Sequence, residues 1–197
     1  MATSLRILVA EDEPLSAMAL QAQLEALGHV VIGPAHNGRE AVDLARANAA
    51  DLAILDVRMP ALSGLEAAQE IAGFREMPVI LLSGYSDPDM IEEATRAPVF
   101  HYLVKPVSMA DLGPAIAVAM TRFHEWRELR GEAEQLEQKL EDRRLIEQAK
   151  GLLMEARGLP EAEAYRLLQK ESQNHNRPMV EIARSIVMSE SLLRDQS

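Results

Sequence analysis

Five side chains that can bind metal or phosphate lie at the ends of short apolar runs. They are Glu11, Asp12, Asp56, Ser83 and Lys105. The runs have the length and the content of Val, Ile and Leu that are typical of buried parallel strands. Because the carboxyl ends of parallel strands meet at one edge of a sheet, we expect these side chains to converge in one crevice.

Three carboxylates and a lysine in one crevice predict phosphate chemistry. Carboxylates that lie close together repel one another unless a cation lies among them, and an all-oxygen ligand set suits Mg²⁺. Lys105 can neutralise an incoming phosphoryl group, and the Ser83 hydroxyl can donate a hydrogen bond to one of its oxygens. Each residue taken alone is more often a turn or surface residue. Only the whole set favours a site that accepts phosphate on a carboxylate.

The elements that must position these residues alternate in type along the chain. Apolar, β-branched runs predict five strands, at 5–10, 29–33, 52–57, 78–83 and 100–104. Amphipathic stretches predict helices at 14–27, 38–48, 64–73 and 87–96, and Asn37 and Ser63 stand where two of them begin. Ser108 and Asp111 have the spacing of a capping box that opens one more helix. The alternation predicts an α/β fold, with a doubly wound, five-stranded parallel sheet.

Residues 4–125 resemble the receiver domain of bacterial two-component response regulators. The words that carry the resemblance are AEDE at 10–13, LDVRMP at 55–60, LLSG at 81–84 and YLVKP at 102–106. The resemblance implies a flavodoxin-like fold. It also implies that Asp56 is the phosphoacceptor, that a sensor histidine kinase supplies the phosphoryl group, and that the domain later hydrolyses its own phosphate.

The receiver resemblance further implies a role for each residue of the site. The implied metal ligands are Glu11, Asp12, Asp56 and the backbone carbonyl of Arg58, and the implied phosphoryl contacts are Ser83 and Lys105. Tyr102 would reorient together with Ser83, although an aromatic residue in a fifth strand fits core packing equally well. A cis bond is implied between Lys105 and Pro106. The run Arg-Ala-Pro-Val-Phe at 96–100 departs from the family pattern.

After about residue 115 the sequence predicts helices only. An apolar stripe with helical spacing comprises Phe123, Trp126, Leu129, Ala133, Leu136 and Leu140. Breaks at 158–160 and 174–178 leave helices at 143–157, 161–173 and 178–193, which together suit a small three-helix bundle. We therefore divide the chain into a receiver-like domain at 1–125, a helical connector at 126–142 and an output domain at 143–197.

Basic residues of the predicted bundle are candidates for contact with RNA. They are Arg143, Lys150, Arg157, Arg166, Lys170 and Arg177. The first three recur every seven residues and so lie along one side of a helix. Charge alone favours a solvated helix face over an RNA contact, and a tyrosine beside Leu168 is more often a core residue than a platform for a base.

Residues 143–187 resemble the ANTAR domain of RNA-binding antiterminators. The matching words are IEQAKGLLMEARGL, AYRLLQKES and EIARSIV. The resemblance implies that the domain binds RNA hairpins in leader transcripts and prevents a terminator from forming. Pro160 stands where the family often has a Ser or Thr helix cap.

The connector has a heptad-like pattern that bears on pairing between chains. In a parallel coiled coil Glu132 would face Glu137, and Lys139 would face Arg144. These like-charged pairs disfavour a parallel zipper and leave antiparallel pairing, or packing of the connector on its own domains. A homodimer that forms on phosphorylation through another surface stays open.

Composition excludes several classes of function. The net charge of −11 repels bulk nucleic acid, and the absence of cysteine excludes disulfides and thiolate metal sites. We expect neither a membrane span nor a signal peptide, and we place the protein in the cytoplasm. The basic residues are not concentrated on one recognition helix, so we do not expect DNA binding. Beyond the acidic crevice the sequence shows no second set of catalytic residues, so we do not expect a metabolic enzyme.

The sequence thus predicts a phosphorylation-controlled response regulator that is not an enzyme in the usual sense. Asp56 would accept a phosphoryl group in the presence of Mg²⁺, and the C-terminal helices would bind RNA hairpins to prevent transcription termination. The alternative is a phosphorylation-gated adaptor whose C-terminal helices bind a protein partner.

Overall fold

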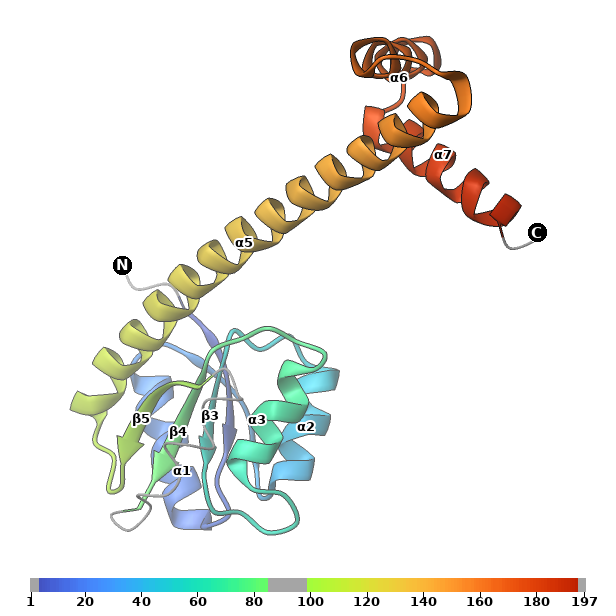
Figure 1. The fold of residues 1–197 in the computed structure, drawn as a ribbon. Helices are drawn as coiled ribbons and strands as arrows, with labels where there is room; N and C mark the ends of the chain where they lie inside the picture. Colours follow the sequence, from blue (N-terminus) through green and yellow to red (C-terminus); the bar gives the residue numbers. More distant parts are fainter. Residues whose placement is uncertain (1–3, 85–98, 195–197) are drawn as a thin grey trace. The chain divides into compact units, whose positions relative to one another are not determined.

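The computed structural model describes residues 4–84 and 99–194, and the chain divides into an N-terminal unit that ends at Arg127 and a C-terminal unit that begins at Glu128 (Figure 1). The expected helix at 87–96 and the first residues of the run at 96–100 lie outside the described residues. None of the described helices is long and apolar enough to cross a membrane.

A five-stranded sheet forms the N-terminal unit. Its strands are β1 (Arg6–Ala10), β2 (Val30–Ala35), β3 (Leu52–Asp56), β4 (Val79–Ser83) and β5 (Val99–Val104). They lie in the order β2-β1-β3-β4-β5, and every neighbouring pair is parallel. The predicted five-stranded parallel sheet is confirmed, with strand ends within two residues of the predicted ones.

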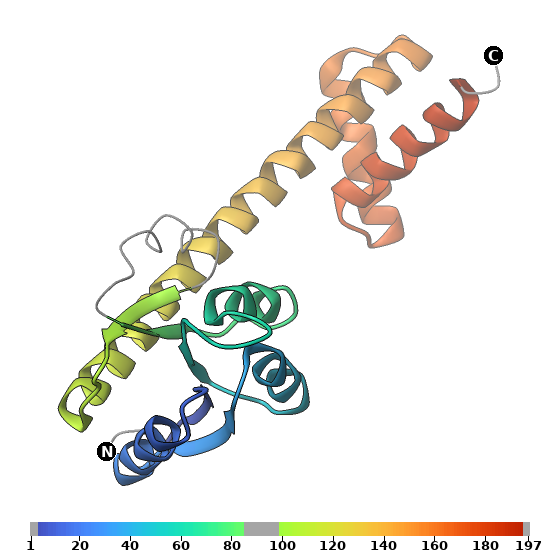
Figure 2. The same cartoon turned by 90° about the horizontal axis from the view of Figure 1, so that it is seen from below.

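Helices cover both faces of this sheet. They are α1 (Pro14–Ala26), α2 (Gly38–Ala47), α3 (Gly64–Ala72) and the first part of α5 (Met109–Arg157). Side chains of β3 alternate between the faces, so that Ala53 and Leu55 join the core beneath α2 and α3, while Leu52 and Ile54 join the core beneath α1 and α5. Figure 2 shows α2 and α3 together on one side of the sheet and α1 on the other.

Local capping explains where three of the helices begin. The Asn37 side chain accepts a hydrogen bond from the backbone of Glu40 before α2. Ser63 and Glu66 form a complete capping box before α3. At the start of α5, the Ser108 hydroxyl donates to Asp111 at 2.6 Å. These starts were predicted from residue type and spacing, because a side-chain oxygen there satisfies backbone N–H groups that a helix end leaves free.

The C-terminal unit is a small three-helix bundle. It contains the last part of α5 together with α6 (Glu161–His175) and α7 (Met179–Arg194). Ala149, Leu168 and Ala183 are fully buried at its centre, and Ile146, Leu153, Ile182 and Ile186 pack against them. Helical spacing puts Ala156 on the same face of its helix as Ile146, Ala149 and Leu153, but Ala156 is exposed, and so is Tyr165, which was expected in the core.

The last receiver helix, the connector and the first output helix form one continuous helix, α5. The helix continues through Gly131 and Gly151. Neither glycine is required by close packing, because an added Cβ at either position would meet only open space. Phe123 and Trp126 belong to the N-terminal unit, where both rings pack against Phe100. Leu129, Leu136 and Leu140 are at least 60% exposed in the single chain.

Gly64, the first residue of α3, packs directly against the backbone of Asp56 at the end of β3. A Cβ at position 64 would overlap the carbonyl oxygen of Asp56. We expect Gly64→Ala to lower the free energy of unfolding of the N-terminal unit by about 1–3 kcal/mol, as overpacking does elsewhere. Urea denaturation followed by the fluorescence of Trp126, the single tryptophan, measures this.

Gly73→Ala is the matched control for this prediction. Gly73 has a helical φ of −64°, and an added Cβ would lie 3.3 Å from the nearest atom, the Glu70 carbonyl oxygen. We expect its effect to be a few tenths of a kcal/mol. Equal stability of the two variants would contradict the close packing at Gly64.

Candidate functional site: an acidic crevice and a helical output bundle

The carboxylates predicted to converge do so at the carboxyl edge of the sheet. Glu11 follows β1 and is 1% exposed, Asp56 ends β3 and is 6% exposed, and Asp12 is open to solvent. One ligand oxygen of each lies within 4.8 Å of the others. The backbone N–H of Glu11 donates to the Ala35 carbonyl at 2.9 Å, which holds this turn against β2.

Lys105 lies directly between two of these carboxylates. Its Nζ is 2.6 Å from Glu11 Oε2 and 2.7 Å from Asp56 Oδ2. The Lys105 backbone N–H donates to the Ser83 carbonyl, and the Lys105–Pro106 bond is cis, as the sequence predicted. The ammonium group is therefore placed by the neighbouring strand ends as well as by its own strand.

The charges of this cluster shift its ionisation. Burial acts to lower the pKa of Lys105, but hydrogen bonds and attraction from Asp56 and Glu11 outweigh it, so the pKa is raised above its usual value. Burial, aided by repulsion from Asp56, raises the pKa of Glu11 in spite of its hydrogen bond with Lys105. The ionised form of Glu11 is therefore less favourable in the folded protein than in water.

The remaining predicted site residues lie on β4, on β5 and in the loop after β3. The Arg58 backbone N–H lies 3.4 Å from Asp56 Oδ1, so the loop after β3 bends back over the acceptor carboxylate. Ser83 ends β4, and its hydroxyl donates to the adjacent Gly84 carbonyl at 3.0 Å. Tyr102 is 38% exposed, so the alternative that made it a buried core residue is wrong.

The donor set fits a hard divalent cation. It consists of carboxylate oxygens only, and two of its three members are buried, where uncompensated negative charge is most unfavourable. Lys105 contacts one oxygen of Glu11 and one of Asp56. The second oxygen of each accepts one long hydrogen bond from a backbone N–H and has a further lone pair for such an ion, as do the oxygens of Asp12. An acidic cluster of this kind is typical of the magnesium site of receiver domains.

Comparison with known proteins identifies the family to which this chain belongs. Residues 7–117 match the family model of the response regulator receiver domain, and residues 134–187 match that of the ANTAR domain. The chain belongs to the response regulators that join a receiver domain to an ANTAR domain. The transcriptional regulatory protein PdtaR of Mycobacterium tuberculosis is 41% identical over 182 residues, which cover 92% of this chain and 89% of PdtaR.

Solved structures support the receiver fold of the N-terminal domain. The receiver domain of a modulated diguanylate cyclase from Desulfovibrio desulfuricans is 34% identical, covers 62% of this chain and 98% of its own, and has a TM-score of 0.58. The receiver domain of the sensor histidine kinase PA1611 from Pseudomonas aeruginosa is 29% identical, with a TM-score of 0.55. It covers 60% of this chain and 99% of its own, and it holds a magnesium ion in its active-site cleft.

The ANTAR domain separates the predicted RNA contacts into two groups. Arg143, Arg157, Arg166, Lys170 and Arg177 are exposed, as expected. Lys150 is not: it is only 7% exposed, and its Nζ lies 2.7 Å from both Glu147 Oε2 and Glu161 Oε1. The expected stripe of three cations along α5 is therefore interrupted, because its middle member ties α5 to the first turn of α6.

Sequence reasoning missed the two partners of Lys150. Glu147 precedes it by one helical turn, a spacing that could have indicated an ion pair. Glu161 lies beyond the turn at Gly158 and Pro160, and no local pattern indicates that pairing. The hydrogen bonds and attraction of both carboxylates raise the pKa of Lys150, so it stays cationic at neutral pH.

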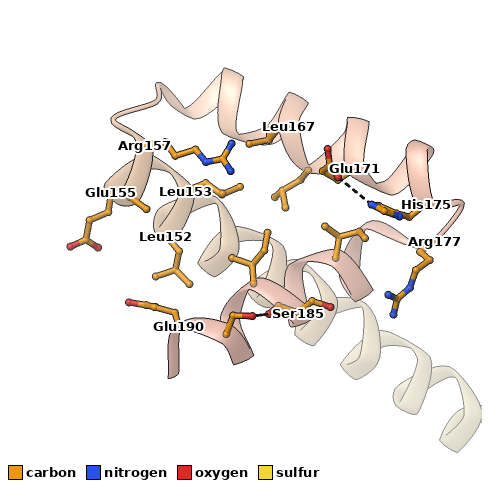
Figure 3. A pocket seen from close by; sticks show the side chains of 15 residues that line it. Leu152, Leu153, Glu155, Arg157, Leu167, Glu171, His175, Arg177, Ser185 and Glu190 are labelled. Carbon is orange, nitrogen blue, oxygen red and sulfur yellow. Dashed lines mark hydrogen bonds and ion pairs between the residues drawn. The ribbon is translucent and has the colours of Figure 1, made fainter. Parts of the chain in front are cut away.

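An open groove of about 800 Å³ runs between the helices of the ANTAR domain (Figure 3). Leu153, Leu168 and Ile186 contribute to its apolar floor. Its rim carries both signs of charge, from Glu155, Arg157, Glu171, Arg177 and Glu190, and it also includes His175. Arg177 pairs locally with Glu181 at 2.8 Å, and His175 lies 3.4 Å from Glu171. The rim therefore has no marked excess of positive charge.

The Lys105 geometry predicts that this ammonium group stabilises the receiver domain. We expect Lys105→Met to lower the free energy of unfolding at pH 7 by roughly 3 kcal/mol, because the substitution leaves buried carboxylates without their cation. The raised pKa of Lys105 means that its contribution is complete at pH 7 and is lost only as the pH rises above the usual lysine range. Urea denaturation followed by Trp126 fluorescence is the measurement.

The pH dependence of this variant provides a second, independent check. The deficit should shrink as the pH falls toward the raised pKa of Glu11, because a protonated Glu11 needs no cation. Lys170→Met, which removes an exposed cation from the ANTAR domain, should leave the Trp126 transition unchanged. A deficit that grew on acidification would contradict the role of Lys105.

Proposed function

We propose that this protein is a phosphorylation-controlled regulator that binds RNA hairpins and prevents transcription termination. The observation that carries the proposal is the cluster of Glu11, Asp12, Asp56 and Lys105 in a chain that also carries an ANTAR domain. We assign the receiver role to residues 1–125, a connecting role to 126–142 and RNA binding to 143–197. We place its action in the cytoplasm.

In this proposal Asp56 is the phosphoacceptor and a sensor histidine kinase is the donor. A carboxylate oxygen of Asp56 forms a bond to phosphorus while the bond between phosphorus and the donor histidine nitrogen breaks. Lys105 already contacts Asp56 at 2.7 Å, so its ammonium group is in place to neutralise the incoming phosphoryl oxygens. Hydrolysis of the acyl phosphate later returns the free carboxylate.

Glu11, Asp12, Asp56 and the backbone carbonyl of Arg58 would hold Mg²⁺ beside the acceptor. A bound Mg²⁺ ion would neutralise charge that develops on the phosphoryl oxygens during transfer. Burial of Glu11 and Asp56 keeps bulk water from screening these interactions.

Ser83 and Tyr102 are the residues that we propose transmit the phosphorylated state. The Ser83 hydroxyl contacts only the neighbouring Gly84 carbonyl among the described residues, a bond that it can exchange for a phosphoryl oxygen. Tyr102 lies on the next strand and is exposed enough to change its orientation. The coupled movement of the two would alter the surface of the receiver domain.

The output that we propose is an RNA hairpin in a leader transcript. The relative PdtaR is described as a transcriptional regulatory protein, and the exposed basic residues of the ANTAR domain can contact phosphates. The stripe of Leu129, Leu136 and Leu140 is exposed in the single chain and is available for antiparallel pairing, whereas a homodimer that forms on phosphorylation would use another surface.

The groove of the ANTAR domain favours one alternative function. Its apolar floor and its rim of mixed charge suit a helix of a protein partner better than they suit a polyanion. In that case the protein would be a phosphorylation-gated adaptor whose C-terminal helices bind protein and not RNA.

Stabilisation by magnesium tests the proposed metal ligands. We expect Mg²⁺ to raise the melting temperature of the receiver domain, because an ion that binds only the folded chain shifts the unfolding equilibrium. Glu11→Gln and Asp12→Asn should each abolish most of this increase. Glu13→Gln removes one acidic charge from the next position and should keep it. An equal increase in all four proteins would count against the assigned ligands.

An RNA-binding experiment tests the proposed switch as a whole. The full-length protein is incubated with a library of RNA hairpins, with and without a small-molecule phosphate donor and Mg²⁺, and Asp56→Asn serves as the control. We expect a selected hairpin whose affinity changes with phosphorylation in the wild type only. If Asp56 is phosphorylated but no hairpin is selected in either state, the adaptor function replaces the antiterminator.

A further inference from the structure

The solvent-exposed face of α6 carries aromatic, amide and basic side chains. Ala164 and Leu168 turn into the core of the ANTAR domain, and Glu161 is held by Lys150 at 2.7 Å. These contacts on one side of α6 fix which residues face solvent on the other. Those residues are Tyr165, Arg166, Gln169, Lys170 and Gln173, and all are exposed.

The five side chains form two rows along α6. At about 100° per residue they occupy an arc of roughly 140° of the helix surface. Tyr165, Gln169 and Gln173 follow one another at intervals of four residues, about 6 Å apart along the axis. Arg166 and Lys170 form a second row beside the first.

The arc that the two rows occupy on α6 contains no carboxylate. Glu161 is turned toward Lys150, and Glu171 lines the groove on another side of the helix. Glu163 borders the arc near its first turn. Within residues 4–84 and 99–194, neither Arg166 nor Lys170 forms an ion pair, with Glu163 or with any other carboxylate.

We propose that this face of α6 is the surface that reads the unpaired loop of an RNA hairpin, an inference that rests on the proposed function. Tyr165 is 45% exposed and offers its ring as a platform on which an unpaired base stacks. Gln169 and Gln173 each present a donor and an acceptor to base edges. Arg166 and Lys170, which form no ion pair among the described residues, contact the phosphates beside those bases.

Charge separates this face from the other surfaces of the ANTAR domain. The groove rim mixes carboxylates with its cations, and Lys150 interrupts the basic stripe on α5. The face of α6 combines an aromatic ring, two amides and two cations on one rigid element, and neither cation has an ion pair in the described part of the chain. A polyanion with exposed bases is the ligand that this combination complements, whereas a protein helix would find no apolar seam on it.

The test uses the full-length protein and the hairpin that the wild type selects from an RNA library with randomised loops. We expect Tyr165→Ala to weaken binding about tenfold or more, as loss of a stacking platform does, and Tyr165→Phe to retain most of the affinity. The double variant Arg166→Ala, Lys170→Ala should reduce the slope of log affinity against log salt by about two. Gln169→Ala should change which loop sequences are selected.

Arg184→Ala is the matched control, since it removes an exposed cation from α7 of the same domain and should leave binding unchanged. All five positions are exposed, and circular dichroism of each variant checks that the bundle is folded. Binding by Tyr165→Ala and by the double variant within twofold of the wild type would overturn the assignment to α6 and leave the RNA function standing. Failure of the wild type to select any hairpin would remove the RNA function itself, and this surface with it.

Discussion

The ammonium group of Lys105 holds together a cluster of charges that would otherwise repel. Three acidic side chains meet at the carboxyl edge of the sheet, and two of them are buried. Their coexistence depends on a cation within hydrogen-bonding distance, which Lys105 provides to both Glu11 and Asp56. The strand order brings the ends of β1, β3 and β5 to this edge, and Gly64 lets α3 pass close to Asp56. The fold of the receiver domain thus brings three carboxylates and a lysine together at one edge of the sheet.

The ANTAR domain uses a second lysine between two carboxylates for a different purpose. Lys150 joins Glu147 on α5 to Glu161 at the start of α6, next to the buried core of Ala149, Leu168 and Ala183. The buried side chains of Ala164 and Leu168 set which side of α6 faces the core, and the ion pair joins the start of α6 to α5. In the receiver domain the lysine lies between two carboxylates of an acidic cluster, whereas here the lysine is withdrawn from the surface. Arg166 and Lys170 are exposed and have no ion pair within the described ranges 4–84 and 99–194.

Much of the fold and of the receiver site was predictable, because the signals are local. Strands follow from apolar, β-branched runs, and the helix starts at Asn37, Ser63 and Ser108 follow from side chains that satisfy free backbone N–H groups. Once five parallel strands are placed, the convergence of the acidic residues and Lys105 at one edge follows from chain geometry. The exposed positions of Tyr165 and Ala156 were not predictable, since helical spacing indicates which residues share a face but not which face is covered.

The sequence by itself determined the types of element, the parallel sheet and the set of groups that meet at its edge. Tertiary structure alone decided how the charges are paired. Lys105 is 49 residues from Asp56, and Lys150 is 11 residues from Glu161, across a turn. Lys150, Arg166 and Lys170 look alike in the sequence, yet the first is buried in ion pairs, while the other two are exposed and have no ion pair within the part of the chain that the structure describes. The physical reason is that periodicity places a residue on one side of its own helix, while burial and pairing depend on which other element packs against that side.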